Sequence, residues 1–115
     1  MEDDMTETLD VLGAEMIVRR DAALFVAENP VPPGYFVPPH RHGSDEETLL
    51  VMAGELTLIG EGGETTVGPG TCRTFEPGEL HGFRNDSGGT VSLLVIASPG
   101  VQLAVELGAT SVDHV

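Results

Sequence analysis

The sequence predicts an all-β domain, folded as an antiparallel sandwich or barrel. Short apolar runs recur along the chain, and turn-forming residues follow them within several positions. The longest apolar run, residues 91–97, is expected to be a buried strand, although periodicity alone is also compatible with a helix. The 115 residues suit one domain with one core, and they contain no internal repeat or low-complexity linker.

The elements of this domain can be placed in chain order by their apolar runs and turn signals. Pro38 and Pro39 forbid a helix and suit an edge strand or a barrel rim, so we expect extended chain around them. The predicted strands are residues 15–20, 22–27, 35–42, 47–53, 55–60, 65–67, 71–76, 81–85 and 91–97. The predicted turns and connections are residues 29–34, 61–63, 68–70, 77–78 and 86–89.

The two ends of the chain are expected to differ from this strand-rich middle. Residues 1–13 are rich in acidic side chains and are predicted to be a flexible segment. Residues 14–110 are predicted to form the single domain, and residues 111–115 a tail. Residues 101–107, which follow a Ser-Pro-Gly turn, could form one short amphipathic C-terminal helix.

The composition disfavours several classes of partner. The formal net charge is −14, and such a field repels phosphate groups, so neither nucleic acids nor anionic membranes are expected partners. No apolar run is long enough to span a bilayer, and the acidic N-terminus lacks the basic and apolar regions of a signal peptide. We therefore expect a cytoplasmic protein. Cys72 is the only cysteine, so no internal disulfide can form, and its side chain is expected to be buried or half-buried.

One short segment carries most of the functional information. His40 and His42 lie two residues apart, and Glu47 follows five residues after the second histidine. Side chains two residues apart on a strand point to the same side. Both imidazoles can therefore reach one point, while Arg41 between them points away.

The same alternation selects the acid that accompanies the histidines. Glu47 shares its parity with Leu49 and Val51, so we expect a carboxylate and two core side chains to face the same interior. Glu46 competes for this role, but its opposite parity favours a solvated position or one beside the site. Asp45 is interpreted as an ordinary loop residue.

A third histidine, His81, follows a Pro-Gly turn and shares its parity with Phe83 and Asn85. Three imidazoles and one carboxylate suit a first-row divalent metal and leave positions open for a substrate, water or dioxygen. A lone histidine is more often a surface or core residue, and His114 near the C-terminus is interpreted in that way. The other three histidines fall within one patterned set, which favours the metal interpretation.

These segments resemble the two sequence motifs of the cupin superfamily. The first motif is a glycine, five residues, His-x-His, three or four residues, a glutamate, six residues and a glycine. Every position of it is matched, by Gly34, His40, His42, Glu47 and Gly54. The motif-bearing stretch, about residues 34–85, covers nearly half of the chain.

The second motif is a glycine, five residues, Pro-x-Gly, two residues, a histidine, three residues and an asparagine. It is matched in register by Gly70, Gly78, His81 and Asn85. The departure is Glu76, which stands where the pattern has proline. Because Pro77 follows directly and still restricts the turn, we expect little effect on His81, and we expect the Glu76 side chain to face solvent.

The resemblance implies a fold, a cofactor and an assembly. Cupins fold as a double-stranded β-helix, which is a jelly-roll barrel. The resemblance implies that His40, His42, Glu47 and His81 bind one divalent transition metal per chain, which could be Fe, Mn, Ni, Co, Cu or Zn. Glu47 would also be the catalytic residue, as a proton acceptor. Small cupins commonly pair through their sheet edges, so a homodimer is expected.

The resemblance supports three functional hypotheses, each with a small-molecule partner. The first is a metal-dependent dioxygenase or related oxygenase of an enol, phenol or diketone. The second is a non-oxidative metal-dependent isomerase, cyclase or lyase, and the third is a non-catalytic cupin that binds a small ligand. A structural zinc is a further alternative, because four protein ligands could close its coordination shell. Tyr35 could orient a substrate oxygen and Arg73 a carboxylate, but a packed tyrosine and a solvent-facing arginine are the more ordinary interpretations.

Overall fold

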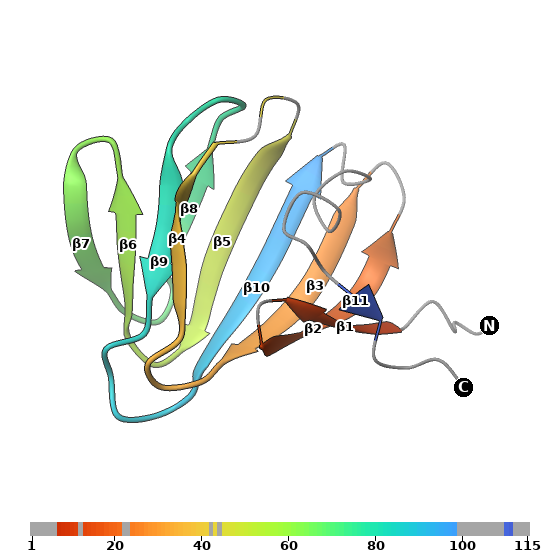
Figure 1. Ribbon diagram of the computed structural model, residues 1–115, viewed down its shortest axis with the longest axis horizontal. Coiled ribbons are helices and arrows are strands. Elements are labelled where there is room, and N and C mark those ends of the chain that lie inside the picture. The colour runs from red at the N-terminus through yellow and green to blue at the C-terminus, as the bar shows by residue number, and fades with distance from the viewer. Residues whose placement is uncertain are drawn as a thin grey trace.

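The computed structural model describes residues 7–11, 13–21, 24–41, 43, 45–98 and 110–111. Over these residues it has eleven β-strands and no helix, and hence no helix long and apolar enough to cross a membrane. The strands pair antiparallel into two sheets (Figure 1). The all-β prediction is therefore confirmed, whereas the helix predicted at residues 101–107 lies outside the described residues.

The larger sheet has seven strands and the smaller has four. The order in the larger sheet is β11 (Thr110–Ser111), β1 (Glu7–Val11), β2 (Ala14–Asp21), β3 (Phe25–Val31), β10 (Val91–Ser98), β5 (Glu46–Ala53) and β8 (Cys72–Phe75). The order in the smaller sheet is β4 (Phe36–His40), β9 (His81–Arg84), β6 (Leu56–Gly60) and β7 (Gly63–Val67). Figure 1 shows the smaller sheet alongside the β5 and β8 end of the larger one.

The core is built from alternate residues of the strands, because removing apolar side chains from water is the main force that orients them. In β5 the side chains of Glu47, Leu49 and Val51 are buried, whereas that of Glu46 is exposed. β10 pairs with β5, and its apolar run also alternates, with one face buried and the other partly exposed. The parity prediction is confirmed, since Glu47 shares the inner face with core residues.

The strands β4 and β9 approach closely at Gly82. A Cβ atom at this position would lie 2.5 Å from the Val37 carbonyl oxygen and 2.9 Å from the Pro39 nitrogen, so only glycine fits without movement. The pairing is irregular between Val37 and His40, and beyond the irregularity His40 lies opposite His81. The two prolines occupy this irregular part of an edge strand, in agreement with the predicted rim position.

The larger sheet extends further than the sequence predicts. Part of the segment predicted to be flexible forms β1, which pairs with β2 along its length. Val11 is buried and Leu9 packs against the core, so this acidic stretch carries an apolar face that its charge obscures. Two residues of β11 pair with β1, at the C-terminal end of the predicted domain. The predicted domain boundaries themselves stay predictions.

β3 also continues beyond its predicted end, into the segment predicted to be a connection. Asn29 pairs with Leu93 and Pro30 with Ser92 of β10. On the other side, pairing with β2 ends at Glu28, so Pro30 lies where β3 has only one neighbour and its missing N–H is tolerated. The predicted connection over residues 29–34 is therefore wrong for residues 29–31, whereas a turn does form at residues 33–34.

Cys72 is exposed, contrary to the prediction of a buried or half-buried side chain. It begins β8, an edge strand of the larger sheet, and lies opposite Leu50 on β5. Leu50 has the outward parity, since Leu49 and Val51 on either side of it are buried. The cysteine therefore points away from the core.

Candidate metal centre

Glu47 and His81 meet in the interior, although they come from different sheets. Glu47 is near the start of β5 and His81 begins β9. The distance from His81 Nε2 to Glu47 Oε1 is 2.8 Å, and the two side chains are only 5% and 8% exposed. The two motif segments thus supply one group each to a buried polar contact.

His40 stands beside this pair at the end of β4. Its ring centroid is 4.5 Å from that of His81, and its Nε2 atom is buried. Each histidine binds a backbone carbonyl through Nδ1, at 2.9 Å from Pro38 O for His40 and 2.9 Å from Glu79 O for His81. Because a carbonyl only accepts, Nδ1 carries the hydrogen in both rings. Metal-binding histidines are commonly oriented in this way, with Nε2 left for the ligand role.

The contact between His81 and Glu47 requires a positive charge between its two atoms. The Nδ1–H group of His81 already donates to Glu79 O, so Nε2 of a neutral ring has only a lone pair to offer. An ionised carboxylate oxygen also has only lone pairs. Two such atoms at 2.8 Å attract each other when a proton or a metal ion lies between them.

The donor chemistry of these residues therefore fits a first-row divalent metal. The described part of the chain contains no group of three or more His, Cys, Asp or Glu side chains placed to hold a metal together. His42 lies outside the described residues. The structure thus brings Glu47 and His81 together with His40 beside them, and the four-ligand assignment stays a prediction.

A small cavity of about 20 Å³ adjoins these groups, which is enough for one water molecule. Met16, Val37 and Leu49 are among the apolar side chains that line it. Asn29 lines it too, and its buried Oδ1 atom accepts no hydrogen bond from the described residues. A buried acceptor of this kind calls for a bound polar group. No sequence signal indicates this role, because Asn29 falls in a predicted turn.

Phe75 forms a wall between His81 and a larger groove. Its ring stacks on the His81 imidazole, with centroids 4.9 Å apart and planes at 21°. The same ring lines a groove of about 360 Å³ between β7 and β8, a volume typical of small-molecule sites. Arg73 also lines this groove, with its guanidinium 4.2 Å from the Phe75 ring centroid. A molecule in the groove would be one ring away from the buried histidine.

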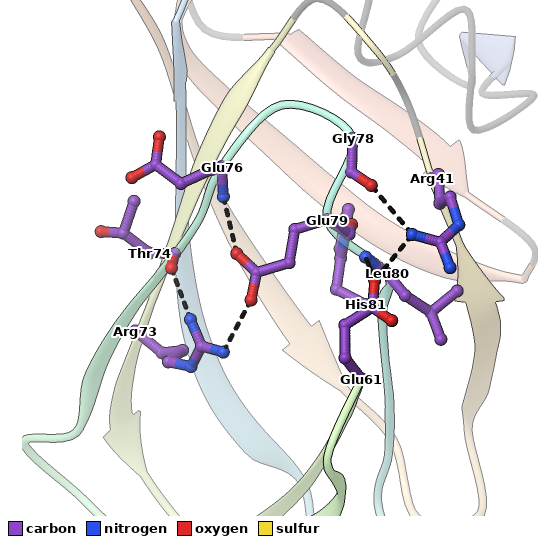
Figure 2. Close-up of polar contacts among 9 residues, drawn as sticks. All are labelled: Arg41, Glu61, Arg73, Thr74, Glu76, Gly78, Glu79, Leu80 and His81. Atoms are coloured by element: carbon purple, nitrogen blue, oxygen red, sulfur yellow. Dashed lines mark hydrogen bonds and ion pairs between the residues drawn. The ribbon is translucent and has the colours of Figure 1, made fainter.

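The turn before His81 is held by charged side chains of other segments (Figure 2). The carboxylate of Glu79 accepts hydrogen bonds from Glu76 N at 2.9 Å and from Arg73 Nη2 at 3.0 Å. The Glu76 amide, followed by the Arg73 guanidinium, lowers the pKa of the Glu79 carboxyl. A proline at position 76, as in the motif, would lack this N–H group. The departure from the motif therefore adds a bond to the turn, while the Glu76 side chain faces solvent as predicted.

Other candidate residues have structural roles. Asn85 donates to Val31 O and Gly89 O, both at 2.9 Å, and thereby braces the turn after β9. The Tyr35 hydroxyl donates to Val11 O, and burial, with a smaller contribution from the charge of Asp10, raises its pKa. Tyr35 is thus a packed aromatic, as the ordinary interpretation expects.

Two further predictions meet different outcomes. Asp45 is buried, at 1% exposure, so the prediction of an ordinary loop residue is wrong. Its backbone lies directly before β5, where the chain enters the interior beside Glu47. Arg73 is exposed, as predicted, but it does not simply face solvent, since its guanidinium covers Phe75 and pairs with Glu79.

Comparison with known proteins identifies a family for most of this region. A family model described as "Cupin domain" matches residues 30–97. This segment contains both histidine-bearing motifs and the strands from which the site is built. No curated protein sequence matches the chain.

Several solved structures share the fold. A structure described as a sugar phosphate isomerase of the cupin superfamily, from Silicibacter pomeroyi, matches with a TM-score of 0.70 and 24% identity, over 76% of this chain and 60% of that one. KdgF from Halomonas sp. matches with a TM-score of 0.67 and 18% identity, over 76% and 79% of the two chains. A structure described as a predicted oxalate decarboxylase, from Thermotoga maritima, matches with a TM-score of 0.67 and 20% identity, over 82% and 91%.

These matches establish the fold and no more. At such low identities the likeness concerns the backbone, and this chain spans only 60% of the length of the isomerase. The double-stranded β-helix expected from the motif resemblance is confirmed. The ligands and reactions of these structural neighbours are therefore not transferred to this chain by the comparison.

Proposed function

The chain belongs to the cupin domain family, and from this premise we propose that it is a metal-dependent enzyme for a small enolisable molecule, such as an enol, phenol or diketone. The observation that supports this best is the buried contact between His81 and Glu47, with His40 beside it. The proposed ligands are His40, His42, Glu47 and His81. When bound, a divalent metal would supply a Lewis acid for a substrate oxygen and, if it is redox-active, a means of activating dioxygen.

Glu47 would act as the proton acceptor. Its Oε1 atom lies 2.8 Å from His81 Nε2, so the imidazole is within hydrogen-bonding distance of a proton held at that atom. The side chain is 8% exposed, and the scarcity of water around it strengthens its interactions with nearby charges. The backbone carbonyls of Pro38 and Glu79 would keep the two imidazoles in their tautomers throughout the reaction.

The surrounding residues would orient the substrate and exclude water. Met16, Val37 and Leu49 give the cavity apolar walls. Asn29 Oδ1 would accept a hydrogen bond from a hydroxyl group of the substrate or from a water molecule beside it. Because the cavity is small, we propose that the substrate enters from the groove and displaces the Phe75 ring.

Oxygenation is the first reaction class that we propose, since an enolate is the form of substrate that a redox-active metal can oxidise. A non-oxidative isomerase or lyase reaction is the second, and the buried carboxylate favours it because proton transfer at carbon needs such a base. Two structural neighbours, described as a sugar phosphate isomerase and as a predicted oxalate decarboxylase, also support this second class.

Metal analysis by mass spectrometry, on protein purified without an affinity tag or chelator, tests the proposal. About one equivalent of a first-row metal per chain is expected from the proposed ligand set. Iron or copper would direct attention to oxygen-uptake assays, and the other metals to isomerase and lyase assays. Protein that contains no metal and takes none up on titration would contradict the proposed function.

Substitutions test the ligand assignment in the same assay. His40→Ala and Glu47→Ala are expected to lower metal occupancy sharply while the fold survives, because a jelly roll has its own apolar core. Glu46→Ala is the matched control, since Glu46 is the neighbouring carboxylate but points outward. Full metal retention in both ligand variants would exclude the assignment.

A further inference from the structure

We propose that Glu61 is a positioning residue, which sets the spacing of the two histidine-bearing segments and thereby the affinity of the site for a divalent metal. This inference rests on the proposed function. Glu61 lies between the two motifs in the sequence and belongs to neither. In the structure it occupies the tight turn between β6 and β7, outside the cluster formed by His40, Glu47 and His81.

One oxygen atom of Glu61 joins the two segments. Glu61 Oε2 accepts a hydrogen bond from Arg41 Nη1 at 2.6 Å and another from Leu80 N at 3.1 Å. Arg41 directly follows His40, and Leu80 directly precedes His81. His40 and His81 are therefore each one residue away from a group held by the same atom. Figure 2 shows Glu61 between Arg41 and Leu80, with His81 beyond.

A third bond closes this arrangement. Arg41 Nη1 also donates to Gly78 O at 3.0 Å, so the arginine contacts the turn before β9 directly as well as through Glu61. Within this turn, Glu79 O accepts a hydrogen bond from His81 Nδ1. A shift of the Gly78–Leu80 backbone would thus move both the position and the orientation of the His81 ring.

Because Arg41 and Glu61 are exposed, their contact can position the backbone without contributing much to the stability of the fold. The side chains of Arg41 and Glu61 are 54% and 52% exposed, and exposed ion pairs contribute little to folding. The hydrogen bond from Arg41, followed by that from Leu80 N, lowers the pKa of the Glu61 carboxyl. Both hydrogen bonds thus favour the ionised form of Glu61, which accepts them at one oxygen atom.

The chain offers a matched control on the same hairpin. Glu64 lies three residues further along and binds Arg84 through both carboxylate oxygens, at 2.8 and 3.1 Å. It has the same charge and similar exposure, but it contacts β9 beyond His81 rather than the turn before it. Loss of one negative charge is therefore common to Glu61→Gln and Glu64→Gln, and only the first variant loosens the link between the two histidine segments.

The experiment measures Co²⁺ binding to the full chain by competition with a chromophoric chelator, and records the visible absorption of bound Co²⁺. Glu61→Gln is expected to weaken Co²⁺ binding by about three- to tenfold, below the roughly 10- to 100-fold range for direct partners of ligands, and to change the absorption bands. Glu64→Gln is expected to match the wild type in affinity and spectrum. Thermal unfolding of the metal-free variants should be unchanged, which shows that the effect is positional.

Three results would overturn the inference. Wild-type affinity and spectrum in Glu61→Gln would remove the positioning role and leave the proposed function standing. Equal weakening in both variants would attribute the effect to net charge. Absence of Co²⁺ binding by the wild-type protein would instead contradict the proposed function and this inference together.

Discussion

The two turns that flank β9 are held in different ways. After the strand, Asn85 closes its own turn, accepting hydrogen bonds from Ser87 N and Ser87 Oγ and donating to Gly89 O. Before the strand, the turn that leads to His81 is held by side chains of other segments. Glu61 accepts a hydrogen bond from Leu80 N, and Arg73 donates one to the carboxylate of Glu79. The first turn is closed mainly by neighbours in sequence, with one further bond from Asn85 to Val31 O, whereas the second is held mainly by side chains of other segments.

We expect the turn after β9 to matter mainly for the stability of the fold, and the turn before β9 mainly for the position of His81. The Asn85 side chain is fully buried, and so is its hydrogen bond to Val31 O, so the loss of this side chain should be felt by the whole fold although the rest of the turn is largely exposed. The turn before His81 is held by exposed ion pairs, which contribute little to folding but fix where a backbone lies. The candidate metal ligand follows the second kind of turn, so its position can be altered without unfolding the protein.

The largest expected loss of stability follows from breaking the locally closed turn. Asn85→Ala removes four hydrogen bonds and leaves the Val31 and Gly89 carbonyls without this donor. We expect the free energy of unfolding in urea to fall by about 2–4 kcal/mol. Ser87→Ala should cost less, because it removes only a hydroxyl group, and equal losses in the two variants would contradict the central role of Asn85.

A somewhat smaller loss is expected at Gly82, on the strand between the two turns. In Gly82→Ala the new Cβ would lie 2.5 Å from Val37 O, so β4 and β9 must separate. We expect urea unfolding to show a loss of about 1–3 kcal/mol, accompanied by weaker Co²⁺ binding because His40 lies on β4. Gly89→Ala is the control, since no atom lies within 4 Å of its new Cβ. Unchanged Co²⁺ binding in Gly82→Ala would show that the spacing of β4 and β9 does not affect the site.

A smaller loss of stability is expected at Tyr35, whose hydroxyl donates a hydrogen bond to a residue 24 positions earlier in the sequence. Tyr35→Phe removes the hydrogen bond to Val11 O, which fastens β1 to the barrel, and should cost about 1 kcal/mol. Co²⁺ affinity should not change, because the hydroxyl is occupied by this backbone bond. A large loss of Co²⁺ affinity would show instead that the hydroxyl contributes to the site.

Tyr35 should also make the stability of the protein depend on pH, and Tyr35→Phe tests this. Because burial, with a smaller contribution from Asp10, raises the pKa of Tyr35 above 10.0, the folded protein holds the phenolic proton more tightly than the unfolded chain. This contribution to stability is complete below the unfolded value and is lost as pH rises through the folded one. Urea unfolding between pH 9 and 11 should therefore show a steeper decline for the wild type than for Tyr35→Phe, and parallel declines would contradict the assignment.

The smallest effect on stability is expected at Glu79, in the remotely held turn. Glu79→Gln weakens its bonds to Arg73 and the Glu76 amide, yet urea unfolding should change little because these groups are partly exposed. Co²⁺ affinity should fall by about threefold, since Glu79 O orients His81. Glu76→Gln keeps the N–H group and should bind like the wild type. A large loss of stability with unchanged Co²⁺ affinity would reverse the comparison between the two turns.

The predictable parts of the molecule are those that alternation and turn chemistry determine locally. Parity places Glu47 inside and Glu46 outside, and the Glu-Gly-Gly hairpin forms between β6 and β7. These features need no knowledge of which strands become neighbours. The family resemblance then adds the overall arrangement, which local patterns leave open among sandwiches and barrels.

The parts that escape prediction depend on pairing between distant segments. Cys72 is exposed because its strand is at a sheet edge and its partner Leu50 points outward. Pro30 is accepted in a strand because the pairing between β2 and β3 stops at Glu28. The roles of Arg41 and Glu61 arise from a contact across 20 positions of sequence, for which neither residue carries a local signal.

The N–H group of Glu76 affects how the turn before His81 can vary during evolution. A proline at this position stiffens a turn covalently, and nothing elsewhere in the chain can relax it. Here the stiffness comes from a carboxylate that Arg73 also holds. Substitutions at variable positions such as Arg73 can therefore adjust the segment leading to His81 without changing any defined position of either motif, which gives natural variation a gradual adjustment in place of a fixed one.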